Sequence, residues 1–133
     1  MFEIEKLPQS LFDKKNAALL TGIMRGAERE ALRTDLDGKL ALTPHPVSLG
    51  SALTHPQITT DFSESLLEFI TPPSHRMGDL FAHLEAIQKY TLSQLKDEII
   101  WTSSMPCGLG EDGDIPVAQY GSSNNGKMKT IYR

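Results

Sequence analysis

The spacing of hydrophobic residues along the chain predicts two helices. Apolar positions at ragged helical spacing over residues 10–23, with Ser10 as the cap, predict the first, which Gly22 and Gly26 would end. A clearer helical pattern covers residues 75–97. Its apolar positions recur on one side of the helix, at Leu80, Leu84, Ile87 and Leu95.

Shorter runs predict four strands, over residues 27–33, 39–43, 66–71 and 99–102. The Asp37-Gly38 pair is typical of a tight hairpin, so the first two strands should be antiparallel. Residues 44–60 and the segment from Ser103 onward are predicted to be mostly loop, although residues 127–133 read as the start of a helix. Strands joined by a hairpin and interleaved with helices favour an α+β fold over a doubly wound parallel sheet.

Composition and charge exclude several functional classes. The 133 residues are 39% hydrophobic and 23% charged, which suits one globular domain. Lysine and arginine are scattered and the net charge is −4, which argues against a nucleic-acid partner. No run approaches the roughly 20 apolar residues of a membrane span. With no signal-peptide pattern and a single cysteine, the expected location is the cytoplasm.

Four carboxylates form the main candidate site. Glu28 and Glu30 are two residues apart, so both side chains point to the same face of a strand. Taken alone, the pair is explained most simply as the solvated face of an edge strand. Glu68 argues otherwise, because it interrupts an apolar run in which neither face looks solvated, and burying an unpaired carboxylate is costly. Asp61 lies just upstream. If the strands are neighbours, this oxygen set suits Mg²⁺ or Mn²⁺.

The other polar groups carry weaker signals. None of the histidines forms a helical i, i+4 pair, so His45, His55, His75 and His83 are expected to be structural or solvated. No neighbouring base activates Cys107, which is expected to be a passive thiol. The glycine-bounded residues 121–127 could present backbone N–H groups to an anion. They do not match a Walker motif, because Met128 follows where Ser or Thr is needed.

Four phrases closely resemble the proteobacterial type of glutamate–cysteine ligase: RGAEREALR (25–33), GSALTHPQITTDFSESLLEFITP (50–72), SSMPC (103–107) and AQYGSSNNGKMKTIYR (118–133). The resemblance covers the chain from about Leu19 to its last residue. It implies an antiparallel sheet like the catalytic domain of glutamine synthetase, curved around the site with helices outside. It also implies ATP-dependent ligation of the glutamate γ-carboxylate to cysteine, the first step of glutathione synthesis, with Mg²⁺ or Mn²⁺.

The same resemblance assigns roles to individual residues. Glu28, Glu30, Asp61 and Glu68 fall on the acidic metal-site positions of the family. Phe62 and Tyr132 correspond to parts of the pocket that receives the cysteine, and Arg133 lies close to it. In that chemistry glutamate is activated as a γ-glutamyl phosphate, and divalent ions offset the charge of the transferring phosphoryl group. The small-molecule partners are therefore expected to be glutamate, cysteine and ATP.

The chain departs from the family in length. Family members are several times longer, and their remaining metal ligands, ATP contacts and glutamate-binding arginine lie beyond position 133. Residues 1–133 are therefore expected to be the N-terminal part of a single catalytic domain, inactive alone, with an incomplete sheet that leaves an edge unpaired. Two alternatives stay open: a non-catalytic remnant or small divalent-metal module, and another amine ligase of the same fold with a different acceptor.

Overall fold

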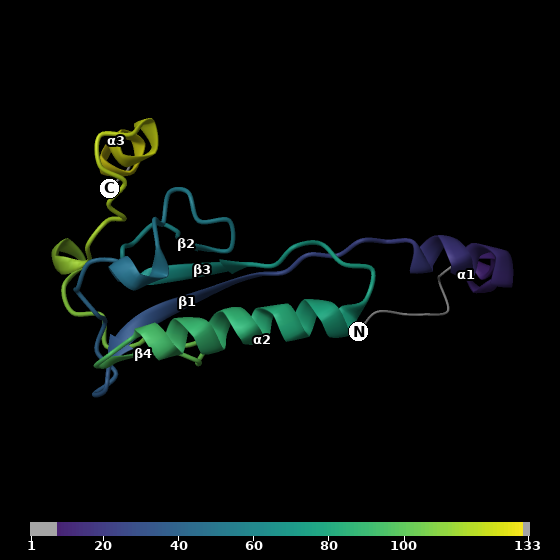
Figure 1. The fold of residues 1–133 in the computed structure, drawn as a ribbon, viewed down its shortest axis with the longest axis horizontal. Coiled ribbons are helices and arrows are strands. Elements are labelled where there is room, and N and C mark those ends of the chain that lie inside the picture. Colours follow the sequence, from purple (N-terminus) through teal and green to yellow (C-terminus); the bar gives the residue numbers. More distant parts are fainter. Residues whose placement is uncertain (1–7, 132–133) are drawn as a thin grey trace.

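The computed structural model describes residues 8–131, in which a four-stranded antiparallel sheet packs against one long helix (Figure 1). The strands, in sheet order β2-β3-β1-β4, are Ile58–Thr60, Leu66–Ile70, Glu28–Asp35 and Glu98–Ile100. The helices are α1 (Lys14–Thr21), α2 (Met77–Gln94) and α3 (Asn124–Ile131), and short 3₁₀ turns cover Gln9–Phe12, Val47–Leu49 and Asp112–Asp114. The predicted α+β class is confirmed. No helix of the described segment is long and apolar enough to cross a membrane.

The core lies between the sheet and α2. Leu67 and Phe69 alternate with half-buried residues along β3, and both are fully buried. The buried apolar cluster on this side is Ala31, Leu49, Ile58, Leu67, Phe69, Ile87, Leu95 and Ile100. The predicted helix over residues 75–97 is thus confirmed, slightly shortened, because its apolar stripe covers this face of the sheet. By contrast, α1 lies apart from the sheet (Figure 1).

Four element predictions need correction. The first helix is split, because Asp13 is extended (φ −68°, ψ 134°) between the 3₁₀ turn and α1. The Asp37-Gly38 turn is present, with Gly38 at φ 79°, but residues 39–43 make only isolated bridges before the prolines. β2, only three residues long, falls in a predicted loop. The helix expected to start within residues 127–133 is present as α3, but it begins earlier, at Asn124, inside the Gly- and Asn-rich segment expected to be loop.

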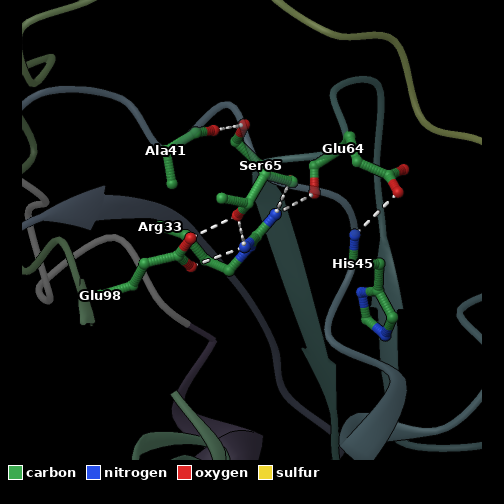
Figure 2. A network of polar contacts seen from close by, with 7 residues as sticks. Arg33, Ala41, His45, Glu64, Ser65 and Glu98 are labelled. Carbon is green, nitrogen blue, oxygen red and sulfur yellow. Dashed lines mark hydrogen bonds and ion pairs between the residues drawn. The ribbon is translucent and has the colours of Figure 1, made fainter. Parts of the chain in front are cut away.

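One buried arginine ties β1 to three other segments. Arg33 is fully buried, and its Nη1 donates to Glu98 Oε2 of β4 at 2.6 Å and to Thr43 Oγ1 at 2.9 Å. Its Nη2 donates to the carbonyl oxygens of Thr43, at 2.7 Å, and Glu64, at 3.2 Å. Figure 2 shows this network. Because a buried charge is tolerated only when it is paired and hydrogen-bonded, Arg33 determines how these segments meet.

Next to this network, the carboxylate of Glu64 joins two loops. Its oxygens accept hydrogen bonds from the backbone N–H of His45 at 2.9 Å and of Gln119 at 2.7 Å. The His45 imidazole is enclosed beside it (Figure 2), and neither ring nitrogen has a hydrogen bond of normal geometry within residues 8–131. Burial lowers the pKa of His45, and Arg33 and His55 add to this, while Glu64 and the Gly50 backbone oppose it.

Replacing Arg33 tests the buried network. Arg33→Met should lower the free energy of unfolding by about 3 kcal/mol, because Glu98 and the two carbonyls lose their donor inside the protein. The matched control is Arg76→Met, whose pair with Asp79 spans 3.9 Å with side chains 83% and 57% exposed. That change should stay within about 0.5 kcal/mol. Urea unfolding followed by circular dichroism measures both, and equal midpoints would contradict the assignment.

Acid should destabilise the fold through His45. The unfolded chain binds a proton at His45 near the ordinary pKa of 6.5, whereas the folded chain resists it, so stability falls as the pH drops below 6.5. His45→Gln should flatten this part of the curve of unfolding free energy against pH. His75→Gln, which removes an exposed imidazole, is the control. An unchanged slope in His45→Gln between pH 7 and pH 5 would show that other groups cause the acid sensitivity.

Candidate metal and substrate site

The sheet brings three of the four predicted carboxylates onto one face. Glu30 of β1 is the direct register partner of Glu68 of β3, and Glu28 lies two residues before Glu30. The face is the one turned away from α2, because the alternate residues on these strands, such as Ala31 and Phe69, are in the core. β4 pairs with β1 only at Arg33–Asp35, so at Glu28 and Glu30 β1 pairs with β3 alone. Both glutamates are exposed there, which agrees with the simple account of a solvated pair on a locally unpaired edge.

These carboxylates act on one another electrostatically. Partial burial raises the pKa of Glu68, and the negative charges of Glu28, Asp61 and Glu30 raise it further, in that order. Lys129 opposes the shift. Asp61 therefore belongs to the same electrostatic group, although it lies on the turn between β2 and β3. A cation placed among these oxygens would relieve the repulsion.

The described residues do not form a finished metal centre. Across residues 8–131, no group of three or more His, Cys, Asp or Glu side chains is placed to hold a metal ion. Glu28 and Glu30 are exposed and Glu68 is half-buried. Carboxylate oxygens are nevertheless the ligand type that Mg²⁺ and Mn²⁺ prefer, so the donor chemistry fits a divalent ion while the number of converging ligands is short.

The carboxylate that the fold buries is Glu64 rather than Glu68. Glu64 is 5% exposed and accepts two backbone N–H groups, so its burial is compensated. The expectation that neither face of the Glu68 strand is solvated is wrong, because the Glu68 face is the partly open one. Sequence reasoning missed Glu64 because it lies in the short turn before β3, where charged residues are ordinarily exposed.

A cavity of about 520 Å³ adjoins the carboxylate face. Its lining includes Glu30 of β1, Phe62 of the turn between β2 and β3, and Trp101 and Met105 of the segment after β4. The Trp101 Nε1–H donates to the Met105 carbonyl oxygen at 2.7 Å, which holds this wall in place. The cavity thus brings a predicted metal ligand and a predicted substrate-binding residue together. Tyr132 and Arg133 lie outside the described residues.

The remaining candidates have structural roles. The Nδ1 atom of His55 accepts the backbone N–H groups of Gln57 at 3.1 Å and Ile58 at 2.8 Å, so this ring organises the turn before β2. Cys107 is buried, and burial raises the pKa of its thiol, in keeping with a passive role. The glycine-bounded loop is the start of α3, where Ser123 Oγ accepts the Gly126 N–H at 3.1 Å. This N–H is therefore used within the protein.

Comparison with known proteins identifies one family along almost the whole chain. The family described as glutamate–cysteine ligase matches residues 9–133. A glutamate–cysteine ligase from Saccharophagus degradans is 72% identical over all 133 residues, and one from Alcanivorax borkumensis is 56% identical over the same length. In both cases the chain spans 25% of the relative's length.

Two solved structures share the fold. Glutamate–cysteine ligase from Francisella tularensis in complex with AMP matches with a TM-score of 0.76 and 45% identity, over 81% of this chain and 22% of that one. A bifunctional glutathione synthetase from Pasteurella multocida matches with a TM-score of 0.75 and 39% identity, over 84% and 16% of the two chains. The antiparallel α+β fold is thus that of glutathione-synthesis ligases. The chain belongs to the glutamate–cysteine ligase family.

Removing the charge of Glu68 should stabilise the metal-free chain. At pH 7 Glu68→Gln should gain about 0.5 kcal/mol, because like charges directly opposite on neighbouring strands are destabilising. The gain should vanish as the pH falls below 4.5, the ordinary Glu value, where the Glu68 carboxyl is protonated. Glu85→Gln is the matched control, since it breaks an exposed 2.7 Å pair with Lys89 and should not stabilise. Urea midpoints of both variants decide the sign.

Proposed function

We propose that this chain is part of an ATP-dependent ligase that joins the γ-carboxylate of glutamate to the amine of cysteine. The observation that carries the proposal is the Glu30–Glu68 register pair, flanked by Glu28 and Asp61, in a chain 72% identical to a ligase of that name. The AMP in the Francisella tularensis relative supports a nucleotide co-substrate. Such a ligase, the first enzyme of glutathione synthesis, would work in the cytoplasm.

In this proposal the carboxylate face holds divalent metal. Glu28, Glu30, Asp61 and Glu68 would supply oxygen ligands for Mg²⁺ or Mn²⁺, and further ligands would come from elsewhere in the ligase. When bound, the ion offsets negative charge on a transferring phosphoryl group. The protein's own part is to place Glu28, Glu30 and Glu68 on one face of the sheet, where their oxygens could be shared by a cation.

The cavity beside Glu30 would receive the acceptor. Phe62 would give it an apolar wall suited to a small thiol side chain. Tyr132 and Arg133 stay predicted acceptor contacts on the strength of the family resemblance alone. Residues 1–133 would then form part of one catalytic domain and be inactive alone. A free-standing metal module is less favoured, because residues 8–131 hold no group of three or more ligands placed around one ion.

A chimera tests the function. Residues 1–133 would replace the matching segment of the Saccharophagus degradans ligase, and ADP release would be measured with glutamate, cysteine and Mg²⁺. The chimera should turn over only when both amino acids are present. Glu68→Gln should lower turnover by about 100-fold, because a ligand oxygen and its charge are lost, although it stabilises the metal-free chain. Glu85→Gln should leave turnover unchanged.

Two results would contradict the proposal. ADP release by the chimera without cysteine would show that cysteine is not the acceptor. Near-normal turnover in Glu68→Gln would show that Glu68 is not a metal ligand.

The 133-residue chain should bind Mn²⁺ weakly in a calorimetric titration, because it holds only part of the proposed ligand set. Tight stoichiometric binding would show that the site is complete without other segments.

A further inference from the structure

Tyr120, which lies just before α3, attaches that segment to the end of β2. The Tyr120 hydroxyl donates to the Thr60 carbonyl oxygen and accepts from Thr60 Oγ1 at 2.9 Å. Thr60 is the last residue of β2 and directly precedes Asp61 and Phe62. The Tyr120 ring is therefore anchored on the segment that carries one predicted metal ligand and one predicted acceptor contact.

Lys129 of α3 contacts both Tyr120 and the turn after β2. Its ammonium lies 5.2 Å from the centroid of the Tyr120 ring and donates a hydrogen bond to the Asp61 carbonyl oxygen. Both contacts favour a cation, through the ring quadrupole and through a charge-assisted hydrogen bond. The side chain is half-buried, whereas Lys127, two residues earlier on the same helix, is exposed. Ordering a long lysine side chain is costly, so these contacts distinguish Lys129 from an ordinary surface lysine.

The approach of α3 to this segment depends on Gly126. Gly126 is buried, and a Cβ atom there would lie 2.5 Å from the Gly121 carbonyl oxygen. Only glycine allows the first turn of α3 to lie against the backbone at Tyr120 and Gly121. The position of α3 is thus fixed by backbone contact at Gly126 near its start and by the contacts of Lys129 near its end. In the sequence, Tyr132 and Arg133 follow the helix directly.

We propose that Lys129 is a positioning residue, which holds the Asp61–Phe62 turn in register with the end of α3. This inference rests on the proposed ligase function, and it adds a residue to which no role is otherwise assigned. Lys129 would couple a predicted metal ligand, Asp61, to the predicted acceptor contact that follows it, Phe62. Its positive charge also opposes the rise in the pKa of Glu68.

The test uses the chimera with Lys129→Met, Lys129→Arg and, as the matched control, Lys127→Met. Lys129→Met should raise the KM for cysteine and the Mg²⁺ concentration for half-activation by about tenfold each, the scale of one cation–π contact with one charged hydrogen bond. The KM for glutamate should change by less than about twofold, because the contacts of Lys129 are with Tyr120 and Asp61, next to the predicted metal and acceptor residues. Lys129→Arg should recover most of the cysteine KM, since a guanidinium can donate and stack in the same way.

Several outcomes would overturn the inference. One is a cysteine KM in Lys129→Met equal to that in Lys127→Met. Another is a cysteine KM in Lys129→Arg as high as that in Lys129→Met. A third is a lower kcat with unchanged KM values that parallels a lower melting temperature, since that would be a purely structural effect. If Lys129→Met does not fold, Tyr120→Phe, which keeps the ring and loses the hydroxyl, should raise the cysteine KM by about threefold. An unchanged KM there would also count against it. Absence of turnover in the unsubstituted chimera would instead contradict the proposed function.

Discussion

The buried guanidinium of Arg33 is the constraint on which the rest of this structure depends. Its Nη1 and Nη2 atoms donate to acceptors from β4, from the loop at Thr43 and from the turn at Glu64, while Nε has no partner within residues 8–131. A shift or rotation of β1 would therefore leave a charge unpaired in the interior. Side chains alternate along a strand, and placing Arg33 and Ala31 on the core side places Glu28 and Glu30 on the opposite face. The same buried contact that holds the segments together thereby orients the candidate metal ligands.

That orientation has an energetic cost. Carboxylates gathered on one face repel each other, and this repulsion adds to partial burial, the larger cause, in raising the pKa of Glu68. Lys129 offsets it only in part, and its ammonium is already engaged by Tyr120 and Asp61. A protein selected for stability alone would place polar uncharged groups here. Acidic groups kept close together against their repulsion are typical of sites that need a cation to function.

The fold could be predicted from sequence where a long or strongly marked pattern existed. The stripe of Leu80, Leu84 and Ile87 is long enough to identify α2, and Asp37-Gly38 identified the turn after β1. Prediction failed for short elements. β2 has three residues and no measurable period, and it exists because β3 lies beside it. α3 begins at residues that ordinarily terminate helices, and Ser123 and the contact at Gly126 are what make it start there.

For the site, residue types and their spacing were enough to show which side chains are chemically suited to bind a cation, and the family phrases pointed to the same four carboxylates. It could not determine which acid is buried. Glu68 sits in an apolar run yet lies on the partly open face, whereas Glu64 sits in a polar turn yet is enclosed. Burial is decided by what packs against a residue from distant parts of the chain, here the N–H groups of His45 and Gln119. The same holds for the strand order, for the Glu30–Glu68 pairing and for the contacts of Lys129 with Asp61 and Tyr120. Each depends on how segments far apart in the sequence pack together, which a local pattern of residues does not encode.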